Sequence, residues 1–173
     1  MAGKTCNKLE DYLKMNHTLT LVQKIPVPID TAWSFFSSPA NLARITPPEM
    51  MFRITGSIAD ENIYPGMIIC YTLYPFMMLP IRWETEITVV QKPFYFEDCQ
   101  KSGPYEDWHH RHIFREIDGG VEMTDFLQYR LPMDFFGELV NALIVCRRLE
   151  EVFTYRRKRV EAILGSFKED KNH

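Results

Sequence analysis

The sequence predicts an α+β fold in which a curved antiparallel seven-stranded sheet wraps around a long C-terminal helix, with two short helices after the first strand. Three observations predict this fold. The strand-like segments alternate apolar and polar residues, as expected for a sheet with one buried face. Short turn signals separate consecutive strands and favour antiparallel pairing. The last long segment, 137–164, carries apolar residues at helical spacing.

The chain has 173 residues, a length typical of one domain. We expect that domain at 17–165, with an N-terminal tail at 1–16 and a C-terminal tail at 166–173. The strand-like pattern begins only after Met15, so the sequence leaves open whether Met1 or Met15 is the native start.

Composition excludes several functional classes. Lys and Arg total 20 against 23 Asp and Glu, for a net charge of −3, which argues against nucleic acid as a partner. No apolar run is long enough to predict a membrane span, and Met1–Asn16 lacks the apolar core of a signal peptide. The four cysteines form no C-x-x-C pair, so we expect free thiols in the cytoplasm, with no metal and no cofactor.

The first elements are one strand and two short helices. The strand is expected at Thr18–Ile25, where the pattern alternates and prolines follow. Asp30 is the expected N-cap of a helix over Thr31–Phe36. Ser38, which precedes a proline, predicts the N-cap of a second short helix that ends near Arg44.

Six further strands are expected, separated by turns rich in glycine, proline and aspartate. Their predicted ranges are Met51–Ser57, Met67–Leu73, Ile81–Val90, Phe94–Gln100, Tyr105–Glu116 and Val121–Leu131. The apolar stretch from Pro75 to Pro80 is interpreted as a loop, and Asp118-Gly119-Gly120 predicts a tight hairpin between the last two strands.

The closing segment, Gly137–Leu164, predicts a helix of roughly 40 Å at 1.5 Å rise per residue. Its apolar stripe needs a large surface to pack on, and the curved sheet is the available one. The basic run Arg156–Arg159 on this helix has acidic neighbours at helical spacing, so it predicts a salt-bridged solvent face.

The segment Trp108–Phe114 is the most informative part of the chain. Read as a strand, it places Trp108, His110, His112 and Phe114 on one face, because side chains alternate with period two. Two aromatic rings and two imidazoles on one surface suit a pocket wall, where apolar groups enclose a ligand and polar groups orient it. The alternative is that both histidines are core residues that tie neighbouring strands together.

Asp125 lies on the apolar face of the final predicted strand, and an unpaired carboxylate there would be costly. The predicted hairpin places it beside His110 and His112, so we expect an imidazole–carboxylate pair. That pair is interpreted first as a structural tie and second as an oriented general base. A metal site would need a third ligand, for which Asp125 is the candidate; no metal is predicted.

The candidate ligand-binding set joins these residues with aromatic side chains on neighbouring strands. Trp83 lies on the inward face of its strand and either stacks on a ligand or fills the core. Tyr71 and Tyr129 each offer a hydroxyl group to the same interior. The complete predicted set is Tyr71, Trp83, Trp108, His110, His112, Phe114, Asp125 and Tyr129.

Four stretches carry a resemblance to a known family. They are Ile29–Phe36, Asn41–Pro48, Gly103–Tyr105 with Trp108–Phe114, and Asp125–Pro132. With the order of elements, they resemble the helix-grip fold of the START-like superfamily, also called SRPBCC or polyketide cyclase/dehydrase-like, and within it the bacterial ligand-binding SRPBCC-domain proteins. The resemblance implies a cavity between the sheet and the C-terminal helix, where members bind lipids, hormones, polyketides or aromatic molecules and a minority catalyse. It carries over no catalytic residue.

Three functions follow as expectations. The first is non-catalytic binding of a small hydrophobic or aromatic molecule. The second is an enzyme of cyclase, dehydratase or hydrolase type, with His110, His112 and Asp125 as its acid–base group. The third is a regulatory protein-interaction module, and a homodimer is left open as a partner.

Overall fold

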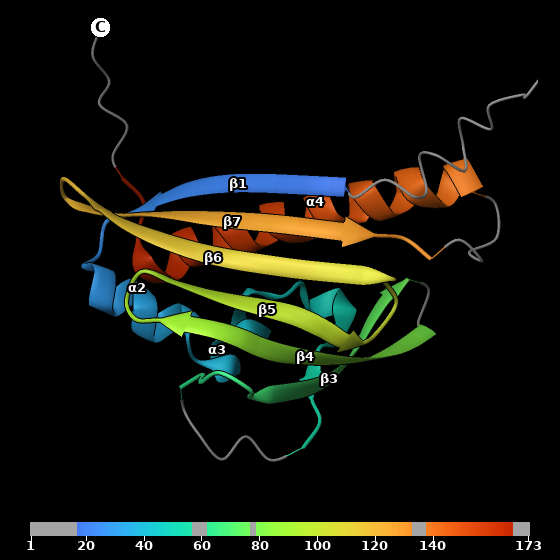
Figure 1. Cartoon of the computed structure of the whole chain (residues 1–173). Coiled ribbons are helices and arrows are strands. Elements are labelled where there is room, and N and C mark those ends of the chain that lie inside the picture. The colour runs from blue at the N-terminus through green and yellow to red at the C-terminus, as the bar shows by residue number, and fades with distance from the viewer. Residues whose placement is uncertain (1–16, 57–61, 77–78, 133–137, 168–173) are drawn as a thin grey trace, which may run out of the picture.

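A seven-stranded antiparallel sheet and a long C-terminal helix form the framework of the protein (Figure 1). The computed structural model describes residues 17–56, 62–76, 79–132 and 138–167. The strand order is β1-β7-β6-β5-β4-β3-β2, so chain neighbours are mostly sheet neighbours and the last strand returns beside the first. The predicted α+β helix-grip architecture is confirmed.

The sheet contains the following strands: β1 His17–Ile25, β2 Arg53–Ile54, β3 Ile68–Phe76, β4 Leu79–Gln91, β5 Tyr95–Ser102, β6 Asp107–Ile117 and β7 Gly120–Arg130. The helices are α2 Ile29–Phe36, α3 Pro39–Leu42 and α4 Glu138–Leu164, with two single 3₁₀ turns, Ala43–Ile45 and Pro48–Met50, between α3 and β2.

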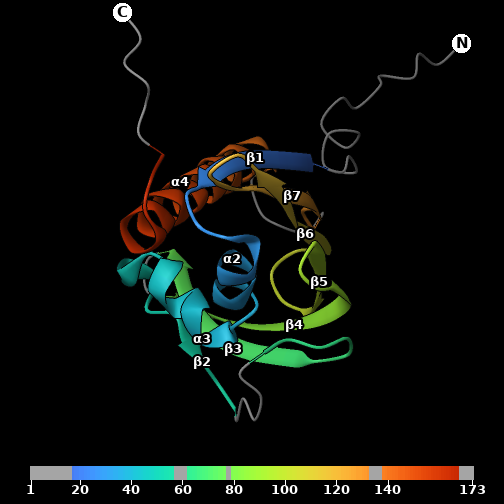
Figure 2. The same cartoon turned by 90° about the vertical axis from the view of Figure 1, so that its left-hand side faces the viewer.

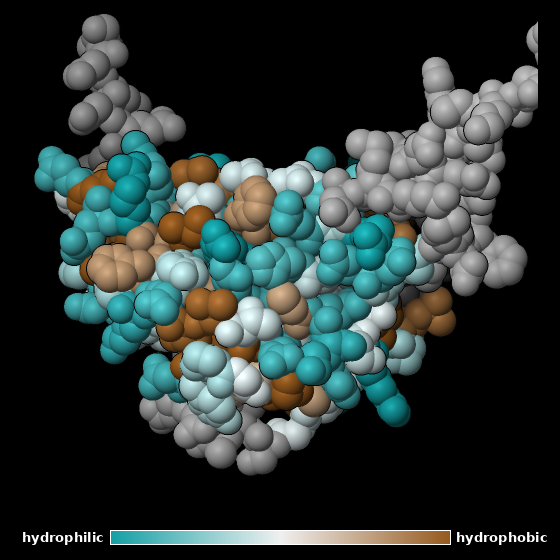
Figure 3. Space-filling view, in the orientation of Figure 1, coloured by the Kyte–Doolittle hydropathy of each residue, from teal (hydrophilic) through white to brown (hydrophobic). Residues whose placement is uncertain are grey.

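The sheet curves around the short helices. Figure 2 shows α2 and α3 on its concave side, with α4 lying across the open side next to β1. Strands alternate buried and exposed residues, and the outward face seen in Figure 3 mixes hydrophilic with scattered hydrophobic side chains. The inward face of the sheet is covered by both α2 and α4, and the buried cluster beneath α2 includes Val160 of α4.

The core beneath α2 is built on aromatic rings. Trp33 packs edge-on against Phe96 and Phe114, with ring centroids 5.9 and 5.8 Å apart. Phe36 meets the same Phe114 ring at 5.5 Å. These contacts anchor α2 to β5 and β6, so the short helix has a fixed position on the sheet.

The hairpin between β6 and β7 follows its sequence signal. Ile117 pairs with Gly120, and Gly119 adopts a φ of 76°, a conformation that glycine takes without steric cost. At Gly120 an added Cβ would collide with the carbonyl oxygen of Ile25 and lie 3.0 Å from the Cα of Pro26. This close approach lets the end of β1 pack on the hairpin.

Gly120→Ala should lower the free energy of unfolding by about 1–3 kcal/mol, because the methyl group would displace backbone atoms. Urea unfolding of the variant measures the loss. Gly66→Ala serves as the comparison, because its added Cβ has nothing within 4 Å and it tests only the positive φ of 86°. A loss at Gly120 no greater than that at Gly66 would contradict the close-approach explanation.

Two predicted segments of the sheet are wrong in extent. Among the described residues of the strand expected at Met51–Ser57, only Arg53–Ile54 is strand, because a 3₁₀ turn precedes it and Met51 adopts a left-handed φ of 43°. A loop was predicted over Pro75–Pro80, but its four described residues belong to strands, Pro75 and Phe76 to β3 and Leu79 and Pro80 to β4, with Phe76 paired to Leu79. Pro75 lies at a register shift, consistent with its lack of a backbone N–H for the ladder.

The first helix also begins earlier than predicted. It starts at Ile29 with Pro28 in the N-cap position, so Asp30 lies inside the first turn and is not the cap. Ser38 does occupy the predicted N-cap of the second short helix, although its side chain makes no capping hydrogen bond. The tail predicted at 1–16 and most of that at 166–173 fall outside the described residues.

Within the ranges that the structure covers, no helix combines the length and the apolar character needed to cross a membrane.

Candidate functional site

A cavity of about 260 Å³ lies on the concave side of the sheet. Side chains from the sheet, from α2 and α3, and from the face of α4 surround it. Most of them are apolar, including Phe35, Leu42, Ile69, Leu73, Leu149 and Val152. Its carboxylate and imidazole lining groups are Asp98, His110 and His112 on the central strands, and its guanidinium groups are Arg148 and Arg156 of α4.

An aromatic wall occupies the end of the cavity away from α2. Trp83 meets Tyr71 in a stacked arrangement at 5.8 Å and Trp108 edge-on at 5.0 Å. Tyr105 lies against both tryptophans, at 5.4 and 4.8 Å. The Tyr71 hydroxyl group is 3.1 Å from that of Thr85, so the polar end of this ring already has a partner.

Four polar side chains from three adjacent strands meet on the inward face beside this wall. In the ladder, Asp98 of β5 is opposite His110 of β6, and His112 of β6 is opposite Asp125 of β7. The antiparallel register therefore places two carboxylates on either side of two imidazoles. His110 and His112 are 4% and 8% exposed, so the cluster is buried.

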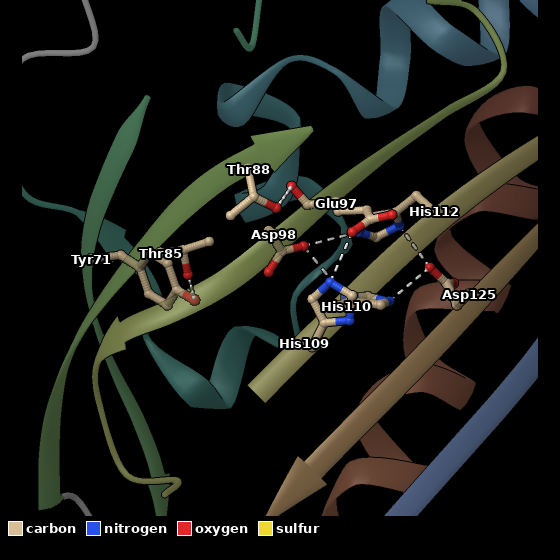
Figure 4. Close-up of polar contacts among 9 residues, drawn as sticks. All are labelled: Tyr71, Thr85, Thr88, Glu97, Asp98, His109, His110, His112 and Asp125. Atoms are coloured by element: carbon tan, nitrogen blue, oxygen red, sulfur yellow. Dashed lines mark hydrogen bonds and ion pairs between the residues drawn. The ribbon is translucent and has the colours of Figure 1, made fainter. Parts of the chain in front are cut away.

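The imidazoles lie between the carboxylates, as Figure 4 shows. Oδ1 of Asp125 is 3.1 Å from Nε2 of His110 and 2.7 Å from Nδ1 of His112. Only the first has hydrogen-bond geometry; the second is a close electrostatic contact. On the other side, Oδ2 of Asp98 is 3.3 Å from Nε2 of His112 and 3.7 Å from Nδ1 of His110.

Both carboxylates are held in the ionised form. Burial by itself would raise the pKa of Asp125, but its contacts with His110 and His112 outweigh burial and hold that pKa well below its usual range. Burial opposes ionisation of Asp98 as well, yet contact with His112 and the nearby imidazole charges lower its pKa.

The surroundings shift the pKa values of the two imidazoles in opposite directions. Burial and the charge of His112 lower the pKa of His110, although Asp125 and Asp98 partly oppose them. Burial would lower the pKa of His112 too, but Asp125 and Asp98 together raise it. The pKa values of the two rings therefore move in opposite directions from the ordinary imidazole value, and His112 is the more basic ring.

Arg156 adds a positive charge at the same end of the cavity. Its guanidinium carbon lies 5.0 Å from the centre of the Phe153 ring, and its Nε is buried without a hydrogen-bond partner. Its charge also favours the ionised form of Asp98. The sequence predicts a solvent-facing, salt-bridged cluster here, and that prediction is wrong for Arg156, which lines the cavity.

The structure separates the predicted site residues into two groups. Tyr71, Trp83, Trp108, His110 and His112 line the cavity. The other three are absent from the lining: Phe114 lies in the core beneath α2, Asp125 lies behind the histidines, and Tyr129 points its hydroxyl group at Cys146 of α4, 3.0 Å from its Sγ.

Sequence reasoning missed Asp98 and Arg156. The sequence does indicate Asp98, because period-two alternation from the buried Phe96 places it on the inward face of β5. It indicates Arg156 more weakly, because Arg156 follows Phe153, a residue of the apolar helix face, by three positions. The imidazole–carboxylate pairing of Asp125 was predicted, and it is present.

This arrangement offers a ligand two kinds of surface. The aromatic and aliphatic walls favour an apolar body, and the buried charged groups favour a polar end of defined geometry. His110 places Nε2 3.1 Å from Oδ1 of Asp125 and directs its other ring nitrogen, Nδ1, toward Asp98, 3.7 Å from Oδ2.

Solved structures share this architecture. Protein Ms6760 from Mycobacterium smegmatis is 19% identical over 85% of this chain and 90% of its own, with a TM-score of 0.61. Protein CV1439 from Chromobacterium violaceum is 11% identical, covers 87% and 99%, and has a TM-score of 0.66. Ginseng major latex-like protein 151 from Panax ginseng is 11% identical, covers 86% and 97%, and has a TM-score of 0.63.

No protein-family model matches the chain, and no curated protein matches its sequence. At identities this low, the structural likenesses show the helix-grip fold alone.

Proposed function

We propose that this protein binds a small hydrophobic or aromatic molecule in the cavity between the sheet and α4, without catalysing a reaction. The supporting observation is the contrast within one cavity: mostly apolar walls enclose about 260 Å³, and a buried cluster of charged side chains lies at one place on them. A merely structural core would fill that space with its own side chains.

Apolar contact alone gives such a ligand weak affinity. A molecule that buries about 300 Å² of apolar surface gains about 7.5 kcal/mol at 25 cal/mol per Å². Association removes at least about 4 kcal/mol of this, which leaves a dissociation constant above about 1 mM. The polar end of the ligand therefore has to contribute, and the groups placed to contact it are His110, His112, Asp98 and Arg156.

Native mass spectrometry of the purified protein tests the proposal directly, because a retained molecule adds a discrete mass. Trp83 and Trp108 line the cavity, so intrinsic fluorescence follows the same event in solution. Failure to retain any small molecule, together with no response of either tryptophan to a panel of apolar aromatic compounds, would overturn the proposal.

Filling the cavity should abolish binding. Val152 of α4 lines it, and Val152→Phe places a ring in the ligand's space. We expect the affinity for an aromatic probe to fall at least about tenfold, or 1.4 kcal/mol. Fluorescence titration with 8-anilinonaphthalene-1-sulfonate measures the change.

Val22→Phe is the matched control, because Val22 is 49% exposed on β1 and does not line the cavity. Its probe affinity should equal that of the unmodified protein. Equal losses in both variants, or none in Val152→Phe while the variant remains folded, would exclude this cavity as the binding site.

The proposal also covers the domain range, the cellular compartment and the oligomeric state of the protein. We propose a single binding domain over 17–165 that acts in the cytoplasm. The three cysteines among the described residues, Cys70, Cys99 and Cys146, are free thiols, which suits a reducing compartment. A homodimer remains a proposal, and sedimentation of the purified protein tests it.

A further inference from the structure

We propose that Asp98, His110 and His112 bind one divalent first-row transition metal ion, such as Zn²⁺ or Fe²⁺, whose open coordination positions face the apolar cavity. One oxygen and two ring nitrogens from these residues lie within 4.8 Å of one another. Two imidazoles and one carboxylate on a shared face form a donor set that binds ferrous and zinc ions. The proposal does not depend on the hydrophobic ligand proposed above.

The spacing of the donor atoms suits an ion between them. A tetrahedral ion with bonds of about 2.1 Å holds its ligand atoms about 3.4 Å apart. The Asp98 Oδ2 lies 3.3 Å from Nε2 of His112 and 3.7 Å from Nδ1 of His110. The two ring nitrogens lie within 4.8 Å of each other, and rotation of the side chains brings them toward the spacing of about 3.4 Å that the ion requires.

The opposite nitrogen of each ring faces Asp125. Its Oδ1 contacts Nε2 of His110 and Nδ1 of His112. A carboxylate in this position accepts hydrogen bonds from the nitrogens that face it, and the other nitrogen of each ring is directed at Asp98 and available to an ion. This is the outer carboxylate–histidine–metal arrangement that orients metal-binding imidazoles.

A cation also fits the gap between two of the ligand atoms. Nδ1 of His110 lies 3.7 Å from Oδ2 of Asp98, too far for a hydrogen bond. An ion between them bonds to both.

Charge balance favours a divalent ion. Two carboxylates and two uncharged imidazoles carry a formal charge of −2, and a divalent ion makes these four side chains neutral, which reduces the cost of burial. Arg156 then gives the surrounding end of the cavity a net positive charge, so a ligand with an anionic oxygen, such as a carboxylate or a phenolate, suits the open positions.

Metal titration of tag-free protein, stripped with a chelator, tests the proposal. We expect Co²⁺ to bind in one equivalent and to give visible absorption bands of a nitrogen–oxygen site, and Zn²⁺ to displace it. Asp98→Asn should weaken Co²⁺ binding at least about tenfold, and Asp125→Asn should weaken it about 10–100-fold through the ring orientation. Near-UV circular dichroism shows that each variant remains folded.

His109→Ala is the matched control. It is a histidine on the same strand, but its Nε2 lies 2.8 Å from Glu97 and it does not line the cavity. Its variant should bind Co²⁺ like the unmodified protein. Absence of stoichiometric binding by the unmodified protein, equal binding by a folded Asp98→Asn variant, or loss of binding in His109→Ala would overturn the metal site. Retention of an apolar molecule by metal-free protein would leave the ligand proposal intact.

Discussion

Phe114→Ala should lower the free energy of unfolding by about 3–5 kcal/mol, the range expected for truncating a buried aromatic ring. Phe114 is 2% exposed, and its ring packs against Trp33, Phe36 and Phe96. Truncation would leave a void among three aromatic partners and loosen α2 on the sheet. Urea unfolding followed by circular dichroism measures the loss, and the slope against denaturant checks that unfolding stays two-state.

The control for this variant is Phe94→Ala, since Phe94 is 60% exposed in the turn before β5. We expect a change within about 0.5 kcal/mol there. The same experiment separates two roles for Phe114, which the sequence assigned to the ligand. A folded Phe114→Leu variant should bind the aromatic probe with unchanged affinity, whereas a ligand-contacting ring would lose affinity without a matching loss of stability.

Asp125→Ala should destabilise the metal-free protein by about 3 kcal/mol, because it removes a buried charge that two imidazoles share. The Nε2–H of His110 would lose its acceptor, and the raised pKa of His112 would lose its principal support. Asp98 retains its contact with His112, which limits the loss. Chemical unfolding at neutral pH in the presence of a chelator measures it.

Asp107→Ala, an exposed aspartate at the start of β6, is the matched control and should change stability by no more than about 0.5 kcal/mol. If Asp125→Ala changed the free energy of unfolding as little as Asp107→Ala, the carboxylate would not support the histidines. That result would also remove the ring-orientation argument for the metal site.

Much of the fold follows from local signals in the sequence. The alternation in β6 placed Trp108, His110, His112 and Phe114 on one face, and the tight turn at Gly119 paired this strand with β7. Those two signals also brought Asp125 opposite His112, because a hairpin determines its own register. The long helix was visible from its spacing alone.

The short edge elements were harder to predict. Residues 51–57 have strand-like composition, but among the described residues 51–56 the strand paired with β3 is Arg53–Ile54. A 3₁₀ turn and the left-handed Met51 set the direction of the chain before it. Composition cannot show where an edge strand ends, because its pairing depends on where the neighbouring strand reaches.

The sequence also does not predict which residues of one strand face lie in the core and which line the cavity. Phe114 and His110 share one strand face, yet α2 covers the first and leaves the second at the cavity. Which part of a strand each helix covers depends on packing between segments far apart in sequence, and period-two alternation does not contain that information.

By itself, the sequence determined the sheet, its inward faces, the closing helix and the pairing of the histidines with Asp125, because periodicity and hairpin register act over short stretches of chain. Only the tertiary structure decided that Asp98 of β5 and Arg156 of α4 join those histidines around one cavity. Their meeting depends on the β5–β6 register and on where α4 lies across the sheet, and both are set by contacts between distant segments.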